Sequence, residues 1–224
     1  MSNQKTGQIS DSKRLAFILA LSGGLMDAYT YIYRGEVFAN AQTGNILLLG
    51  VHLSEGNYQK ALSYFFPVAA FAFGIVIAEL IRHFCMEDSF FHWRQLAVLF
   101  ECAILFLVGF FPTKYNLAAN SLVSFACGIQ VESFRKVKGN ASATTMCIGN
   151  LRSGTQALCD FILKKDKSYL SKSVIYYGII LSFTLGAIIG NVMIKFSSQR
   201  AIWCSCALLL IGFLLMFRQG EKEK

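Results

Sequence analysis

The residues best suited to chemistry lie in a short polar segment, Thr43, Gly44 and Asn45, within an otherwise apolar stretch of the chain. Glycine lets the backbone approach a ligand closely, and the hydroxyl and amide supply donors and acceptors. Asn40 and Gln42 add two amides nearby. If Thr43 caps a short helix, the free N–H groups and positive dipole end of that helix suit an anionic solute. The alternative is tight packing, in which these side chains satisfy exposed backbone groups.

A second polar segment repeats this pattern about 105 residues later. It contains Thr144, Thr145, Gly149 and Asn150, and Arg152 follows shortly after. A guanidinium beside a helix end could hold an anion through two parallel hydrogen bonds. Arg152 could equally extend to the membrane surface as ordinary flanking charge. The two segments together predict a solute-binding pocket.

Asp27 is a carboxylate well inside the first apolar stretch. Such groups are costly in hydrocarbon and usually face a bundle interior or a solute path. Asp27 is therefore a candidate to bind the solute, a coupling ion or a proton. The alternative is a structural partner for Arg34 on the same helix face. Gln130, in the matching stretch of the second copy, could face the same pocket across from Asp27.

Glu101 and Glu132 are further acids within apolar stretches, and both are candidates for a coupling or relay role. For Glu132 a local ion pair with Lys136, four residues further on, is an adequate alternative. Glu101 has no such neighbour and is less easily explained as structural.

Composition predicts a membrane protein. Hydrophobic residues make up 54% of the 224 residues, charged residues only 15%, and the mean hydropathy is +0.48. A soluble domain of this length does not need so much apolar sequence. Two segments, 39–52 and 143–163, are shorter or more polar than the others. The sequence leaves open whether each of them spans the membrane or re-enters it. Six others approach the ~20 residues that a transmembrane helix needs: 15–33, 58–82, 94–112, 116–134, 170–194 and 199–217.

The positions of the basic residues distinguish a topology of eight spans from one of six. With eight spans, Lys and Arg divide almost equally between the two sides of the membrane. If the two short segments enter and return, six spans remain and the division becomes sixteen to five. The side richer in Lys and Arg is normally cytoplasmic. This favours six spans with both termini in the cytoplasm.

The expected fold is an all-α membrane protein with six transmembrane helices and two short re-entrant helices. Because each copy then holds three spans, the second copy is inverted relative to the first. The expected units are a cytoplasmic arm 1–14, a first repeat 15–112, a second repeat 116–217 and a cytoplasmic tail 218–224. Non-helical backbone at membrane depth must line a cavity or be buried in protein, so the pocket is expected between the repeats. The alternative is a parallel duplication with eight spans.

Other classes of site find little support. The seven cysteines and three histidines have no spacing typical of a metal site, so no metal or cofactor is expected. The net charge of +8 comes from residues in loops beside the membrane, which predict topology and not nucleic-acid binding. No nucleophile–base pair is apparent, so an enzyme is not expected. The expected partners are the lipid bilayer and a small polar or anionic solute, and a homo-oligomer is compatible with the sequence.

Four motifs resemble those of a known family. They are Gly-x-x-Asp-Ala from Gly24, Val-Phe-Ala-Asn-x-x-Thr-Gly-Asn ending at Asn45, Gly-Ile-Gln from Gly128 and Ala-Thr-Thr ending at Thr145. Together they are similar to the YoaK-type family of bacterial inner-membrane proteins, a domain of unknown function, over residues 12–217. The resemblance implies a multi-span protein of the bacterial cytoplasmic membrane. It implies no particular substrate or reaction.

The favoured function is a small secondary transporter or exporter that moves its solute by rocking one repeat against the other. A passive channel is a variant that needs a continuous polar path. The alternatives are a non-catalytic membrane partner or sensor and, less favoured, a membrane-embedded enzyme. The direction of transport, the solute and the coupling ion are left open by the sequence.

Overall fold

The computed structural model describes residues 13–84, 93–137, 140–141 and 145–220. Within these ranges the chain is almost entirely helical, apart from one antiparallel pair of two-residue strands, β1 (Lys136–Val137) and β2 (Asn140–Ala141). The α-helices are α1 (Lys13–Ala28), α2 (Gln42–Ser54), α3 (Tyr58–Phe84), α4 (Trp93–Val108), α5 (Asn116–Ser133), α6 (Cys147–Lys164), α7 (Lys167–Ser197) and α8 (Trp203–Gly220). Shorter helical turns are η2 (Tyr29–Tyr33), η3 (Thr113–Tyr115) and η4 (Ser198–Ile202).

Each of the eight segments predicted from hydropathy forms a helix, which agrees with the all-α membrane class. Within the described residues, three continuous helical stretches are long and apolar enough to cross a bilayer: Lys13–Tyr33, Tyr58–Phe84 and Lys167–Met216, the last of which contains α7, η4 and the greater part of α8. Bulky apolar side chains such as Phe73 and Leu181 are 58% and 60% exposed on these helices. Such an apolar outer surface is suited to lipid contact.

Glycines bring α1 against α7. A Cβ added to Gly24 of α1 would overlap the carbonyl oxygen of Phe183, and one added to Gly186 of α7 would overlap that of Leu21. The two backbones are therefore in direct contact, which only residues without a side chain permit.

A second crossing, between α3 and α5, has the same construction. A Cβ on Gly74 of α3 would overlap the carbonyl oxygen of Phe125, and one on Gly128 of α5 would overlap that of Phe71. Each crossing thus joins one helix of the first half of the chain to one helix of the second half. Backbone contact fixes the position of all four helices.

The largest apolar core lies among α1, α4, α5 and α8. It includes the fully buried residues Leu19, Leu105, Val123 and Leu209. These four helices contact one another as α1 with α8, α4 with α5 and α4 with α8. The core therefore also joins the two halves of the chain.

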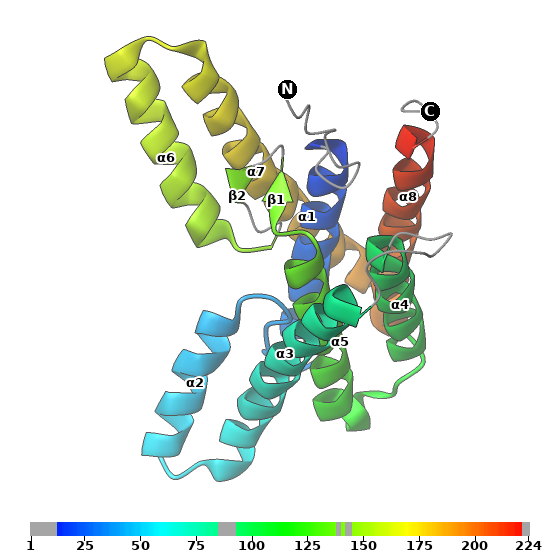
Figure 1. Cartoon of the computed structure of the whole chain (residues 1–224). Helices are drawn as coiled ribbons and strands as arrows, with labels where there is room; N and C mark the ends of the chain where they lie inside the picture. The colour runs from blue at the N-terminus through cyan, green and yellow to red at the C-terminus, as the bar shows by residue number, and fades with distance from the viewer. Residues whose placement is uncertain (1–12, 85–92, 138–139, 142–144, 221–224) are drawn as a thin grey trace.

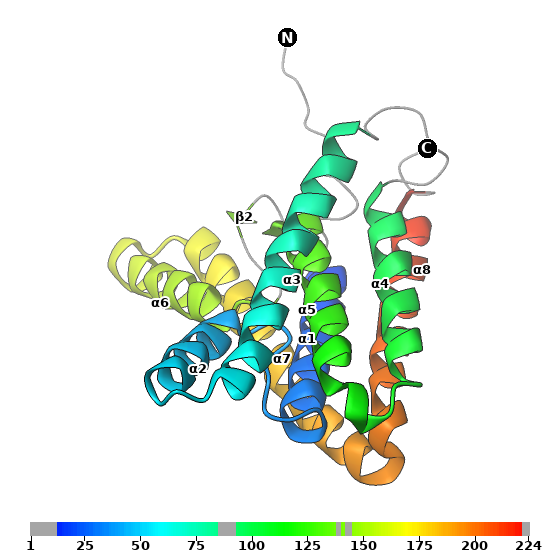
Figure 2. The ribbon, with the colours of Figure 1, turned by 90° about the horizontal axis from the view of Figure 1, so that it is seen from below.

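Two helical hairpins extend from this core. In Figure 1, α2 and α3 extend toward the bottom of the view and α6 and α7 toward the top. In both views α2 and α6 lie on the same flank of the molecule, and in Figure 1 they extend away from each other (Figures 1 and 2). At the α6–α7 turn, Asp166 accepts the backbone N–H of Ser168 at 2.8 Å, and this hydrogen bond lowers the pKa of the Asp166 carboxyl. The start of α1 and the end of α8 lie together at the top of Figure 1.

Candidate functional site

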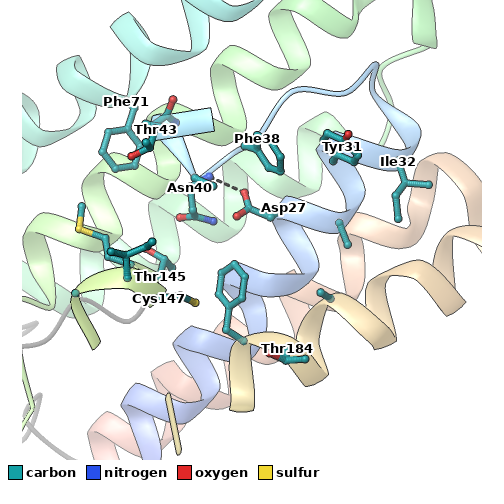
Figure 3. A pocket seen from close by; sticks show the side chains of 18 of the residues that line it. Asp27, Tyr31, Ile32, Phe38, Asn40, Thr43, Phe71, Thr145, Cys147 and Thr184 are labelled. Carbon is teal, nitrogen blue, oxygen red and sulfur yellow. Dashed lines mark hydrogen bonds between the residues drawn. The ribbon is translucent and has the colours of Figure 1, made fainter. Parts of the chain in front are cut away.

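A cavity of about 770 Å³ lies where the first turns of α2 and α6 meet α1 and α7 (Figure 3). This volume is in the range of sites that bind small organic molecules. Its polar lining consists of Asp27, Asn40, Gln42, Thr43, Thr145, Thr184 and Asn191. Its apolar lining includes Tyr31, Ile32, Phe38, Phe71, Ile148 and Phe183.

Asp27, on the last turn of α1, lines the cavity and also bonds to the segment that precedes α2. Its Oδ1 accepts the backbone N–H of Asn40 at 2.7 Å, a contact drawn in Figure 3. The side-chain Nδ2 of Asn40 donates to the carbonyl of Gly23 at 3.2 Å. Asp27 is 7% exposed and Asn40 is 4% exposed. The carboxylate therefore holds the α2 entry segment in position and also borders the cavity.

The structural alternative for Asp27 was a pair with Arg34, but Arg34 bonds to other groups. Its Nε and one terminal nitrogen donate to the Tyr29 hydroxyl at 2.9 Å and 2.6 Å. The guanidinium also donates to the carbonyl of Val108 at 3.1 Å and to Asn116 at 3.3 Å. Arg34 thus satisfies the C-terminal end of α4 from a buried position, away from the cavity.

A set of hydrogen bonds closes the start of α2. Asn45 accepts the backbone N–H of Phe38 at 2.9 Å and donates to the Phe38 carbonyl at 2.7 Å. Its amide also donates to Gln42 at 2.8 Å, and Gln42 donates to the Ala39 carbonyl at 2.7 Å. Asn45 is 0% exposed and does not line the cavity. Its geometry matches the packing alternative, whereas Gln42 also borders the cavity.

Thr43 lies in the first turn of α2 and does not cap the helix, contrary to the expected cap. The helix begins at Gln42, and its N-cap residue Ala41 makes no side-chain cap bond. The Gly44 N–H donates to the Ala41 carbonyl at 2.9 Å, which removes one of the N–H groups that a cap would serve. Thr43 instead lines the cavity. A Cβ on Gly44 would lie 2.8 Å from the Phe38 ring, so this glycine serves packing.

The second copy contributes through the start of α6. Thr145 and Gly149 line the cavity, and a Cβ on Gly149 would meet no atom within 4 Å. Asn150 is 2% exposed and, like Asn45, does not line the cavity. Arg152 is exposed on α6 and does not line it either, which corrects the anion clamp and favours an ordinary flanking charge. Thr144 lies outside the described residues.

Two buried polar atoms at the cavity have no hydrogen-bond partner within the described residues: Oδ1 of Asn40 and Oγ1 of Thr145. Each residue is 4% exposed. Both side chains approach Gly23, where a Cβ would overlap the Thr145 methyl group and lie 3.7 Å from Asn40 Nδ2. Unpaired buried acceptors are rare because they lose their hydrogen bonds to water. These two atoms are therefore candidate acceptors for a solute.

Gln130 does not face the cavity, contrary to expectation. With its amide nitrogen toward Glu101, it donates to the two carboxylate oxygens at 2.7 Å and 3.1 Å. Gln130 and Glu101 are each 1% exposed at the contact between α5 and α4. The amide that sequence reasoning assigned to the pocket thus serves the second buried acid.

Glu132 also lies away from the cavity. Its carboxylate lies 3.1 Å from the guanidinium of Arg135, three residues further on. A local ion pair is therefore present at Glu132, and its described partner is Arg135. Within the described residues, no group of three or more His, Cys, Asp or Glu could hold a metal ion.

Sequence reasoning missed most of the apolar lining and two polar groups, Thr184 and Asn191 of α7. Tyr31 and Phe38 stack with ring centroids 4.7 Å apart and form one wall. Phe38 belongs to the first polar motif, so its position beside Asn40 was the available signal. The sequence did not show that residues of α7 face the cavity, because their position depends on the Gly24–Gly186 crossing between segments far apart in the chain.

Comparison with known proteins agrees with the resemblance inferred from the motifs. The chain is similar to the UPF0700 transmembrane protein YoaK of Bacillus subtilis (strain 168), with 26% identity over 220 residues, which cover 93% of this chain and 96% of that protein. No solved structure matches the chain. The family model described as "Protein of unknown function (DUF1275)" matches residues 15–215, so this membrane protein belongs to that family.

Proposed function

We propose that this protein is a small secondary transporter or exporter, and that the cavity between α2 and α6 is its solute site. The observation that carries the proposal is that two helices, α2 and α6, begin at the same cavity, which they line together with α1 and α7. Transporters commonly build midplane sites from helices that are broken in this way. Irregular backbone at membrane depth is tolerated where it borders such a cavity.

The proposed topology has six spans, with α2 and α6 re-entering from opposite sides. α2 has 13 residues and is about 20 Å long, which is short of the ~30 Å hydrocarbon core. α6 has 18 residues, so its proposed re-entry is supported by the division of Lys and Arg and not by its length. The hairpins of α2 with α3 and of α6 with α7 extend toward opposite ends of the molecule (Figure 1). In that view the start of α1 and the end of α8 lie at the same end of the molecule, which supports both termini on one side of the membrane. The division of Lys and Arg favours the cytoplasmic side.

An inverted repeat is supported by contacts that correspond between the halves. Exchanging α1 with α5, α2 with α6, α3 with α7 and α4 with α8 turns every major helix contact into another one that is present. The two glycine crossings are exchanged by the same operation. Rocking of one half against the other would expose the cavity to each side in turn.

The solute in this proposal is small and polar, with an apolar part. The expectation of an anion depended on Arg152 and on free N–H groups at the α2 start, and Arg152 does not line the cavity. Asp27 and the buried Glu101 are proposed as the acids that couple solute movement to an ion or proton. Because no described lining residue forms a nucleophile–base pair, we propose that the protein is not an enzyme.

Side-specific labelling tests the topology. Single cysteines at exposed Asn57, in the α2–α3 turn, and at exposed Lys167, at the start of α7, are treated with a membrane-impermeant maleimide in a variant without the seven native cysteines. The six-span proposal expects Asn57→Cys to react from outside and Lys167→Cys from the cytoplasm. Reaction of both from the same side would mean eight spans and overturn the inverted repeat.

Transport itself is tested in liposomes that contain the purified protein. We expect flux of at least one solute from a panel of amines, alcohols and carboxylates, and inhibition when a bulky reagent is attached at Thr43→Cys, whose side chain borders the cavity. A matched label at Asn57→Cys, outside the cavity, should leave that flux unchanged. Absence of flux across the whole panel would overturn the transporter proposal.

A further inference from the structure

We propose that the cavity binds a small organic cation, a protonated primary amine on an apolar skeleton, with the ammonium group at Asp27, Asn40 and Thr145. This inference rests on the proposed function only in taking the cavity as the solute site. It goes further by naming the chemical class of the solute, which is opposite in charge to the anion expected from sequence.

Charge gives the first reason. Asp27 is the only lining residue of the Asp, Glu, Lys, Arg and His types among those described, so the one ionisable acid of the cavity has no cationic neighbour there. Arg34, the nearest cation on its own helix, is committed to Tyr29 and to the end of α4. Within the described residues Asp27 forms no ion pair. A buried carboxylate is stabilised by a cation that enters its site.

Hydrogen-bonding capacity gives the second reason. Oδ1 of Asn40 and Oγ1 of Thr145 lack partners within the described residues, and both side chains meet at Gly23. Asn40 is bonded through its backbone N–H to Asp27, and the side chains of Asn40 and Thr145 both approach Gly23, so the three residues lie together at the cavity (Figure 3). An ammonium group has three N–H donors and no acceptor. Three acceptors of which one is charged therefore match a primary ammonium.

At the start of α2, the donors that an anion would need are largely used within the protein. The N–H of Asn40 donates to Asp27, and that of Gln42 donates to the Asn40 carbonyl at 2.8 Å. The N–H of Gly44 donates to Ala41. A carboxylate placed at this end of α2 would meet the negative Asp27 without a free row of N–H groups to compensate.

Aromatic and aliphatic side chains suit the rest of such a solute. Tyr31, Phe38, Phe71 and Phe183 line the cavity from four different elements or segments. Their ring faces attract cations and their area accepts an apolar skeleton. An inorganic cation would leave this surface unused, so an organic amine is the better match.

Binding is tested on the purified full-length protein in detergent by isothermal titration calorimetry. The probe is 2-phenylethylammonium, and its comparison ligands of similar shape are 2-phenylethanol and 3-phenylpropionate. We expect the ammonium to bind at least roughly tenfold more tightly than either. This series is measured on the unmodified protein, so it does not depend on the folding of any variant. Tighter binding of 3-phenylpropionate would overturn the inference.

Two substitutions then locate the site. Asp27→Asn should weaken binding of the ammonium by roughly tenfold or more, and Thr145→Val, which keeps the side-chain shape, by a smaller factor of about three to ten. The matched control is Asp160→Asn on α6, an acid outside the cavity that pairs with Lys164, and it should not change binding. Unchanged binding in both Asp27→Asn and Thr145→Val would overturn the inference.

Flux measurements separate the two proposals. Flux of 3-phenylpropionate with no binding of the ammonium would overturn the amine assignment while the transporter stands. Binding of the ammonium without flux of any solute in liposomes would leave the amine site standing and overturn the transporter.

Discussion

The starts of α2 and α6 have related sequences but differ in how far their own side chains fill them. At α2, Asn45 and Gln42 bond to the preceding backbone, and Gly44 lies under the Phe38 ring. At α6, a Cβ on Gly149 would meet no atom, and Thr145 leaves its hydroxyl without a partner within the described residues. The glycine and amide of the first copy are thus packed against Phe38, whereas the glycine of the second copy borders open space at the cavity.

The two copies also differ in charge. Asp27 lies three residues after the crossing glycine Gly24, and Val131 lies three residues after the crossing glycine Gly128. The glycines and their contacts correspond, but only the first copy has the acid. The duplicated scaffold therefore carries an unduplicated chemical group, which is how two similar halves can form one asymmetric binding site.

The largest effects should come from the feature that the copies share, the glycine crossings. Gly24→Ala and Gly128→Ala each place a methyl group on a backbone carbonyl that cannot rotate away. Each should lower the free energy of unfolding by about 3 kcal/mol or more, because overpacking forces the helices apart. Reversible unfolding in mixed micelles, followed by circular dichroism, measures this.

The matched control is Gly50→Ala in α2, where an added Cβ meets no atom within 4 Å. It should stabilise the helix by about 0.5–1 kcal/mol, because alanine is the better helix former. A large cost for Gly24→Ala with none for Gly128→Ala would contradict the equivalence of the two crossings.

A smaller effect is expected at Asn45, which closes the start of α2. Asn45→Ala removes the bonds to the N–H and carbonyl of Phe38 and leaves both backbone groups unsatisfied. The free energy of unfolding should fall by about 2 kcal/mol, as measured in the same micelle system. Gln59→Ala, at an exposed position in the first turn of α3, is the control and should change it by less than about 0.5 kcal/mol. Equal effects of the two would mean that the α2 start is not closed by its own side chains.

The helices and the membrane class could be predicted from sequence because they depend on local composition. A run of apolar residues forms a helix in the bilayer wherever its neighbours lie, since the backbone must bond internally. The contact between Gly24 and the helix of Gly186 could not be predicted, because the crossing joins segments far apart in the chain.

The site was predicted only in part because side-chain direction depends on packing. Asp27, Thr43 and Thr145 border the cavity, but Gln130 turns away from it to bond Glu101. A residue can lie at the right depth on a helix and still face the wrong neighbour after a rotation of one position. Asn45 shows the other limit, because an amide able to bind a ligand can equally satisfy its own backbone.

A third prediction compares the equivalent glycines Gly44 and Gly149 directly. Gly44→Ala pushes its methyl group against the Phe38 ring, 2.8 Å away, and should lower the free energy of unfolding by about 1 kcal/mol. Gly149→Ala adds the same methyl group to open space at the cavity wall and should not destabilise the protein. Unfolding in mixed micelles measures both. A greater cost at Gly149 would reverse the assignment of packed and open copies.

The smallest effect is expected where α4 meets α8, because there the copies are both equivalent and weakly bonded. The thiol of Cys102 approaches the carbonyl of Cys206 at 3.7 Å, and the thiol of Cys206 approaches the carbonyl of Cys102 at 3.5 Å. The two cysteines have the same spacing in sequence as Gly24 and Gly128. Thiol hydrogen bonds are weak, so Cys102→Ala and Cys206→Ala should each cost about 1 kcal/mol or less and differ little from each other. Clearly unequal costs in micelle unfolding would mean that the two halves are not packed equivalently where α4 meets α8.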